Sequence, residues 1–377
     1  MSRTDLAGQP GRRRRVHIDA DGRTASRKSE HLRVNLHEDV AAKGIRSGFD
    51  DYLFVPRALP ELNFGDVDSS TELFGRRLSA PILISCMTGG TAEARRLNHM
   101  LARVAQRSRL AMGLGSGRAL LEHPELVETF DVRSVAPDVL LFANLGAVQL
   151  NKGYGAGDCQ RLVDVLRADA LVLHLNALQE ALQPEGDTCF EGVLERIGEV
   201  CRRLDVPVVV KEVGWGISPD DVRALLDVGV AAVDVAGAGG TSWSEVERHR
   251  IAEPWRSRVA GAFAGWGIPT AECLQSARRA AADARIFASG GVRTGIDVAK
   301  AIALGADLVG IAGPFLRAAA QGTNAAMDLA RELSEVLRVA MFAIGARTLA
   351  DLRLTRRLRR RGEALVDPPS SGEVEGA

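Results

Sequence analysis

Two glycine-rich stretches late in the chain follow directly after apolar runs. ASGGVRTG contains Gly290, Gly291 and Arg293, and LVGIAGPF, about twenty residues further on, contains Ala312 and Gly313. Glycines leave backbone N–H groups open to anion oxygens, and a following helix N-terminus favours negative charge. The pair of stretches therefore predicts a phosphate site. The alternative is that these glycines only make tight turns.

Lys211 is the second residue with a chemical signal, because VPVVVKEV places a lysine inside an apolar run. A lysine is almost never buried without a partner. One interpretation is a strand-end lysine whose ammonium group reaches water. The other is a fixed cation that faces a bound ring. A phosphate site and a fixed cation together suit flavin mononucleotide (FMN), whose reduced ring carries negative charge near N1.

A second set of basic residues predicts a second anion site. RKSEH contains Arg27, Lys28 and His31, Arg118 follows AMGLGSG, and His174 lies in LVLHLN. One turn of helix would bring Lys28 and His31 to one face. For the RKSEH group the alternative is a solvated helix start, and for His174 it is a hydrogen-bonded core histidine.

Polar residues follow His174 closely in NALQEALQPEGD, which contains Asn176, Gln179 and Glu180. A carboxylate beside a polyanion is the usual arrangement for Mg²⁺, which is held by one or two carboxylates plus substrate phosphates. Glu180 is the predicted metal ligand. Glu185 in the same loop is the competitor, and a solvent-exposed loop acid is the alternative for both.

The elements that must position these residues repeat one pattern, a short β-branched run followed by a longer stretch with helical spacing. The runs are 81–86, 110–116, 139–145, 170–176, 206–212, 230–237, 284–290 and 306–313. Continuous apolar strands that alternate with helices indicate a parallel sheet, and eight such units predict a closed (β/α)₈ TIM barrel with an N-terminal arm. In such a barrel the chemistry lies at the carboxyl ends of the strands.

Composition limits the partners and the compartment. Lys plus Arg and Asp plus Glu both number 48, so no global field predicts binding to nucleic acid or to a membrane. The five cysteines form no CxxC pair, which fits a reducing, cytoplasmic location. We expect residues 1–26, with the basic run 12–15, and residues 363–377 to be disordered tails around one barrel domain at 27–362.

The residues resemble a known family, the type 2, FMN-dependent isopentenyl diphosphate isomerases. The similarity runs in collinear order from about residue 27 to 355 and is carried by RKSEH, GFDD, ALPELNFGDVDSSTELFG, ISCMTGG, AMGLGSGR, ANLGAVQLNKGYG, HLNALQEALQPEGD, VVVKEVGWGIS, DVAGAGGTSW, GWGIPTAE, ASGGVRTGIDVAKAIALG and AMFAIGARTLADL. Any one of these motifs is weak, whereas the ordered series is specific.

The resemblance implies an enzyme that binds FMN and Mg²⁺, uses NADPH as reductant and interconverts isopentenyl and dimethylallyl diphosphate, in a homotetramer or homo-octamer. It implies FMN contacts from Cys86, Met87, Thr88, Ser116, Asn144, Lys211, Thr241, Gly291, Val292, Arg293, Ala312 and Gly313. It implies substrate contacts from Arg27, Lys28, His31, Arg118, Asn176 and Gln179, catalytic roles for Gln179, Lys211 and His174, and Glu180 on the metal. Cys86 and Gly313 depart from the family pattern, and this bears on flavin packing.

The chemistry that this family carries out is demanding, because an isolated alkene is a poor base. No His–carboxylate pair is evident in the sequence as the acid, and the resemblance implies that reduced FMN supplies it. Two other functions compete. A hydroxy-acid oxidase of the same fold needs a histidine base near the late strands, yet the last histidine is His249. A non-catalytic flavin-binding barrel is the second alternative.

Overall fold

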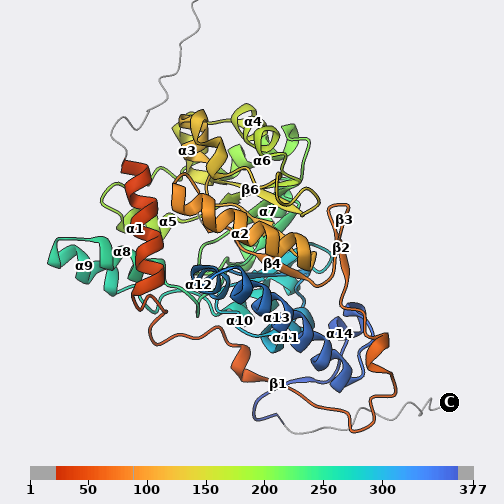
Figure 1. Ribbon diagram of the computed structural model, residues 1–377. Helices are drawn as coiled ribbons and strands as arrows, with labels where there is room; N and C mark the ends of the chain where they lie inside the picture. The colour runs from red at the N-terminus through yellow and green to blue at the C-terminus, as the bar shows by residue number, and fades with distance from the viewer. Residues whose placement is uncertain (1–22, 88, 364–377) are drawn as a thin grey trace, which may run out of the picture.

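A closed barrel of parallel strands forms the centre of the protein. The computed structural model describes residues 23–87 and 89–363. The barrel order is β10-β11-β4-β5-β6-β7-β8-β9. Figure 1 shows the helices that surround the barrel. The strands are β4 (Ile82–Ile84), β5 (Ala111–Gly113), β6 (Leu141–Gly146), β7 (Ala170–His174), β8 (Val208–Lys211), β9 (Ala232–Asp234), β10 (Ile286–Ser289) and β11 (Leu308–Ile311). All eight predicted runs are confirmed as barrel strands.

Helices cover the outside of the barrel because each presents one apolar face to it. These helices are α2 (Ala92–Ser108), α4 (Ala156–Leu166), α6 (Val193–Arg203), α7 (Pro219–Asp227), α10 (Thr270–Ala280), α11 (Gly295–Ala303), α12 (Gly313–Gln321) and α13 (Thr323–Ile344). In α2, for example, Leu97, Leu101 and Val104 are buried, and the Thr91 side chain caps the helix by accepting from the backbone N–H of Ala94.

A β-hairpin closes the amino-terminal end of the barrel. Strands β2 (Thr71–Leu73) and β3 (Arg76–Leu78) are joined by Phe74 and Gly75, both with positive φ, as a two-residue turn of this kind requires. The Phe74 ring packs 6.2 Å from the Phe142 ring inside the barrel. The barrel interior is therefore a filled core, and a ligand can enter only at the carboxyl end of the strands.

An N-terminal helix packs beside that open end. Helix α1 (Arg23–His37) contacts α8 (Trp243–Arg250) and α12 (Figure 1). Its first residue, Arg23, falls within the stretch 1–26 that we expected to be a disordered tail. The rest of that tail, with the basic run 12–15, lies outside the described residues, as does nearly all of 363–377.

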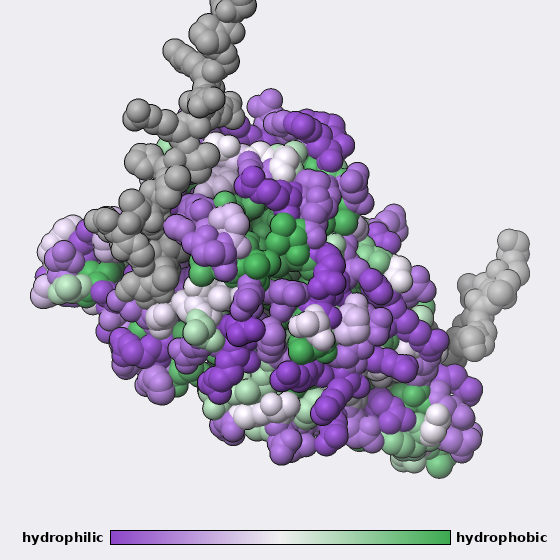
Figure 2. Space-filling model, turned by 45° about the horizontal axis from the view of Figure 1, so that its top comes forward, coloured by the Kyte–Doolittle hydropathy of each residue, from purple (hydrophilic) through white to green (hydrophobic). Residues whose placement is uncertain are grey.

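The remaining elements are short and lie in the loops. They are η1 (Phe49–Asp51), β1 (Tyr52–Phe54), η2 (Phe64–Asp66), α3 (Arg118–Glu122), η3 (Pro124–Thr129), η4 (Ala147–Lys152), α5 (Ala177–Leu182), α9 (Pro254–Gly261), α14 (Leu349–Arg353) and β12 (Leu358–Arg360). Strand β1 pairs antiparallel with β12 outside the barrel. Figure 2 shows a largely hydrophilic face with a smaller apolar area near its middle. Within the described ranges, no helix is both long and apolar enough to cross a membrane.

Candidate active site

One cavity of about 490 Å³ opens at the carboxyl ends of the strands. It gathers nearly all the residues that the sequence predicted. The predicted residues that line it are Arg27, Lys28, His31, Cys86, Met87, Ser116, Arg118, Asn144, His174, Asn176, Gln179, Glu180, Lys211, Thr241, Gly291, Val292, Arg293, Ala312 and Gly313. Thr88 lies outside the described residues. Segments far apart in the chain thus form a single site.

Glycines after β9 and β10 build a close-packed backbone cradle in this cavity. Gly290 and Gly291 have φ of 102° and 72°, and a Cβ at Gly290 would lie 2.0 Å from the carbonyl oxygen of Gly237. Only glycine fits such an approach. The N-terminus of α12 begins next to it at Gly313. These features fit the phosphate of FMN, as the two glycine-rich stretches predicted.

Two arginines beside the cradle have no counter-charge. The guanidinium groups of Arg293 and Arg317 both line the cavity, and neither has a hydrogen bond or an ion pair within the described parts of the chain. The sequence predicted Arg293 but missed Arg317, because an arginine in the first turns of a helix usually faces solvent. Two unpaired guanidinium groups in the cavity that contains the cradle favour a bound phosphate.

The cavity wall between these groups carries Lys211 and Cys86. Lys211 ends β8, and its ammonium donates to the carbonyl oxygen of Glu212 over 2.6 Å. Cys86 follows β4, and burial raises the pKa of its thiol. The opposing residue is Gly113, where a Cβ would lie only 2.4 Å from the Cys86 sulfur. Glycine at 113 is what allows the larger Cys86 side chain in this wall.

The predicted cations Arg27, Lys28 and Arg118 approach the cavity from α1 and from the start of α3. The Lys28 ammonium donates to the carbonyl oxygen of Ser116 over 2.9 Å and lies 5.2 Å from the centre of the Phe130 ring. Burial, followed by the positive charges of Arg27 and Arg118, lowers the pKa of Lys28 to about 7. Cations that repel each other in this way form a ready site for a polyanion.

Arg118 is held by acids that the sequence did not single out. Its Nε donates to Glu122 over 2.9 Å, and the same Glu122 oxygen accepts from the Tyr154 hydroxyl over 2.7 Å. Its Nη1 reaches Asp187 over 3.4 Å, and Asp187 also pairs with Lys152 over 2.8 Å. The Glu122 side chain is fully buried. One edge of the Arg118 guanidinium is therefore fixed while the group still lines the cavity.

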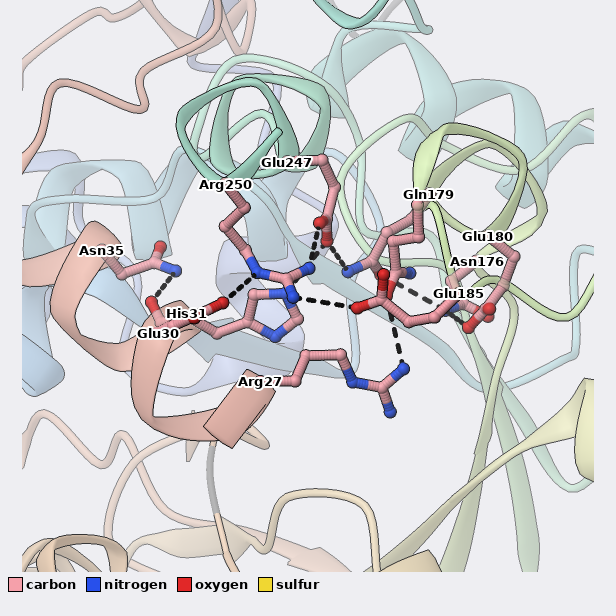
Figure 3. Close-up of polar contacts among 11 residues, drawn as sticks. Arg27, Glu30, His31, Asn35, Asn176, Gln179, Glu180, Glu185, Glu247 and Arg250 are labelled. Carbon is pink, nitrogen blue, oxygen red and sulfur yellow. Dashed lines mark hydrogen bonds and ion pairs between the residues drawn. The ribbon is translucent and has the colours of Figure 1, made fainter. Parts of the chain in front are cut away.

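A polar network joins α1, α5 and α8 at the side of the cavity (Figure 3). Glu247 accepts from Gln179 over 2.8 Å and lies 3.0 Å from His31 Nε2, and Arg250 pairs with it over 2.5 Å. The Glu247 side chain is fully buried. His31 and Glu247 thus form a His–carboxylate pair that was not evident in the sequence. The pair was missed because its members lie 216 residues apart in the chain.

Glu180 and Asn176 lie together at the start of α5 (Figure 3). The Glu180 oxygens accept from Asn176 Nδ2 over 2.7 Å and from the Asp187 backbone N–H over 2.6 Å, and burial raises the pKa of Glu180. Over the described residues no group of three or more His, Cys, Asp or Glu side chains could hold a metal alone. Glu180 can still contribute one ligand, since Mg²⁺ takes most of its others from phosphate and water. Glu185 instead pairs with Arg250.

His174 ends β7 as a neutral group. Its Nδ1 lies 2.8 Å from the side-chain oxygen of Asn144, which can only accept, so Nδ1 carries the proton and Nε2 is an acceptor. Burial, followed by the charge of Lys211, lowers the pKa of His174 to about 3. His174 is thus not one of the cations that attract an anion, and it differs in this from Arg27 and Lys28.

Comparison with known proteins agrees with this geometry. The model of the FMN-dependent dehydrogenase family matches residues 20–123 and 174–359. Among solved structures, a mutant flavocytochrome b2 with pyruvate bound is similar, with a TM-score of 0.66 and 20% sequence identity. The match covers 92% of this chain and 90% of the flavocytochrome chain. A mandelate oxidase is similar with a TM-score of 0.60 and 20% identity over 90% and 98%. At this identity the solved structures establish the fold.

Curated relatives are much more similar in sequence. An isopentenyl-diphosphate delta-isomerase from Synechococcus is 53% identical over 336 residues, which is 89% of this chain and 97% of the relative. The proteins of that name from Nostoc and from Rickettsia bellii are both 49% identical, over 89% and 87% of this chain. The chain is therefore an enzyme that belongs to the type 2, FMN-dependent isopentenyl-diphosphate delta-isomerase family.

Proposed function

We propose that this enzyme interconverts isopentenyl and dimethylallyl diphosphate with FMN in its reduced form, Mg²⁺ on the diphosphate, and NADPH as the reductant. The observation that carries the proposal is the presence of two separate anion sites in one cavity. The glycine cradle with Arg293 suits the FMN phosphate, and the group of Arg27, Lys28 and Arg118 suits a diphosphate. A hydroxy-acid substrate has no diphosphate to occupy the second site.

The chain's own residues hold and orient the substrate. Arg27, Lys28 and Arg118 bind diphosphate oxygens, and Glu180 supplies a carboxylate ligand for Mg²⁺, whose role is to neutralise the diphosphate charge. Asn176 and Gln179 place the hydrocarbon end. Their side chains are fixed by hydrogen bonds to Glu180 and Glu247, so they cannot rotate away from the substrate.

FMN, when reduced and bound, supplies the acid and base that move the alkene proton, and no net oxidation results. Lys211 sits in the wall as a fixed cation that stabilises negative charge on the ring. His174 Nε2 offers an acceptor on the same wall.

The competing oxidase function lacks its base. The chain has no histidine after His249, which lies on α8 and does not line the cavity. His31 and His174 do line it. Neither follows a late barrel strand, because His31 lies on α1 and His174 ends β7. The similarity to mandelate oxidase thus establishes the fold alone.

NMR of isopentenyl diphosphate tests the proposal. The protein is incubated anaerobically with FMN, NADPH and Mg²⁺, and we expect dimethylallyl diphosphate to form only when FMN is present. Arg293→Ala should weaken FMN binding by about tenfold or more, because a charge-assisted hydrogen bond is lost. Arg331→Ala, which changes an exposed residue on α13, should not. A protein that binds FMN, oxidises 2-hydroxy acids and leaves isopentenyl diphosphate unchanged would refute the proposal.

A further inference from the structure

A buried carboxylate lies beneath the wall of the cavity, next to Lys211. Asp234 is the last residue of β9 and is 1% exposed. In the parallel pairing of β8 and β9 it stands opposite Lys211. Residues in register on neighbouring strands point to the same side of a sheet. The Asp234 carboxylate therefore lies on the side of the barrel wall to which Lys211 belongs.

Only one of the two Asp234 oxygens is satisfied. Oδ1 accepts from the Ser289 hydroxyl over 2.8 Å and from the Ala236 backbone N–H over 3.2 Å. Oδ2 is buried and has no hydrogen-bond partner in the described part of the chain, and the same is true of the nearby Ser85 hydroxyl. An unsatisfied buried carboxylate oxygen is costly, so a role in the site would explain why an acid is placed here.

Gly310 on β11 keeps this carboxylate close to the cavity. A Cβ at Gly310 would lie 2.5 Å from the Ser85 hydroxyl oxygen and 3.7 Å from Asp234 Oδ2. Ser85, Ser289 and Gly310 all line the cavity, whereas Asp234 does not. Asp234 is therefore separated from the ligand space by the small side chains of two serines and by a glycine.

Lys211 is the cation that acts on Asp234. Burial raises the pKa of Asp234, and the charge of Lys211, followed by the hydrogen bond from Ser289, opposes that rise. The same Lys211 charge acts on the other titratable groups of this wall, Cys86 and His174. Burial acts against the charged form of both of these groups. The Lys211 charge also acts on Glu212, but that carboxylate accepts from the backbone N–H groups of Gly214 and Trp215, whereas Asp234 Oδ2 has no partner in the described part of the chain.

We propose that the Asp234 carboxylate is a counter-charge to Lys211, which lowers the positive potential at the FMN ring and so sets the reduction potential of the flavin. The inference rests on the proposed FMN site. Charges in a buried wall are weakly screened by solvent and salt. A negative group behind Lys211 therefore offsets part of the stabilisation that Lys211 gives to the anionic reduced ring.

The reduction potential of bound FMN, measured by equilibration with a reference dye at pH 7, tests this inference. Asp234→Asn removes the charge and keeps the shape, and we expect a more positive potential. Lys211→Met should give a more negative potential, and the double variant should lie between Lys211→Met and the wild type. Asp227→Asn, an exposed acid at the end of α7, is the matched control and should change nothing.

An Asp234→Asn protein with FMN bound and an unchanged or more negative potential would overturn the inference. If that single variant does not fold, Lys211→Met and the double variant decide the question, because the double variant leaves no uncompensated buried charge. Equal potentials in these two proteins overturn the inference as well. The wild-type protein distinguishes failure of this inference from failure of the proposed function. If the proposed function is wrong, the wild type will bind no FMN or will bind it without isomerising the substrate.

Discussion

The lowered pKa of Lys28 makes substrate binding depend on pH in a way that can be measured. In the absence of a ligand, burial and the charges of Arg27 and Arg118 bring the Lys28 pKa to about 7. A diphosphate placed among these cations favours the protonated form. The ligand-free protein must therefore take up a proton at Lys28 when it binds, and affinity must fall as pH rises above 7.

The magnitude follows from the pKa. With Lys28 at about 7 in the free protein and protonated in the complex, binding takes up about 0.5 proton at pH 7 and about 0.9 proton at pH 8. Across pH 7 to 9 the protonated fraction of Lys28 falls about 50-fold, and affinity should fall by the same factor. Affinity falls with rising pH because the fold lowers the Lys28 pKa, so that the free protein loses this proton near pH 7 while the complex keeps it.

Isothermal titration calorimetry of isopentenyl diphosphate binding to FMN-free protein measures this proton uptake. The binding heat is measured in two buffers with different ionisation enthalpies, and the difference gives the number of protons taken up. Lys28→Met should lose this uptake, and subtracting its result removes the ligand's own titration. Lys152→Met is the control, because Lys152 is half-exposed and paired with Asp187. Equal proton uptake by the wild type and Lys28→Met would refute the reasoning.

Two further predictions concern acids near the diphosphate site. Glu180→Gln should keep FMN bound but sharply raise the Mg²⁺ requirement or abolish turnover, whereas Glu185→Gln should do neither. Titration of the isomerase rate with Mg²⁺ checks this. Normal Mg²⁺ dependence in Glu180→Gln would contradict the assignment of Glu180 as a metal ligand. Glu122→Gln removes the charge that holds Arg118, so KM should rise about tenfold with little change in kcat, whereas Glu125→Gln at an exposed site should behave as wild type. A fall in kcat alone would contradict the positioning role.

The barrel could be predicted from the sequence because its strands are buried on both faces. Such strands appear as uninterrupted apolar runs, for example VLLF before Asn144, and the polar residue that ends each run marks the carboxyl edge of the sheet. Because all these ends meet at one rim, residues as distant as His174, Lys211 and Arg293 could be assigned to one site.

The hairpin that closes the barrel and the acids of α8 could not be predicted in the same way. The turn at Phe74 and Gly75 lacks the Asn-Gly or Asp-Gly signal of a two-residue hairpin loop. The segment WSEVERHR has the composition of a solvated helix, so nothing local marks Glu247 as buried. Its burial arises only when His31 and Gln179 reach it from other segments, and such tertiary partners leave no local pattern.

The two acids that lie beside Gln179, namely Glu180 and Glu247, are already committed as hydrogen-bond acceptors. Burial acts to raise the pKa of Glu247, but the hydrogen bond from His31 and the charge of Arg250 outweigh it and hold the pKa below its usual value. Both Glu180 oxygens accept hydrogen bonds. His174 has a pKa of about 3 and is neutral where the enzyme works. Since an isolated alkene requires a strong, unencumbered proton donor, these residues serve better as a rigid frame, which supports assigning the donor to reduced FMN.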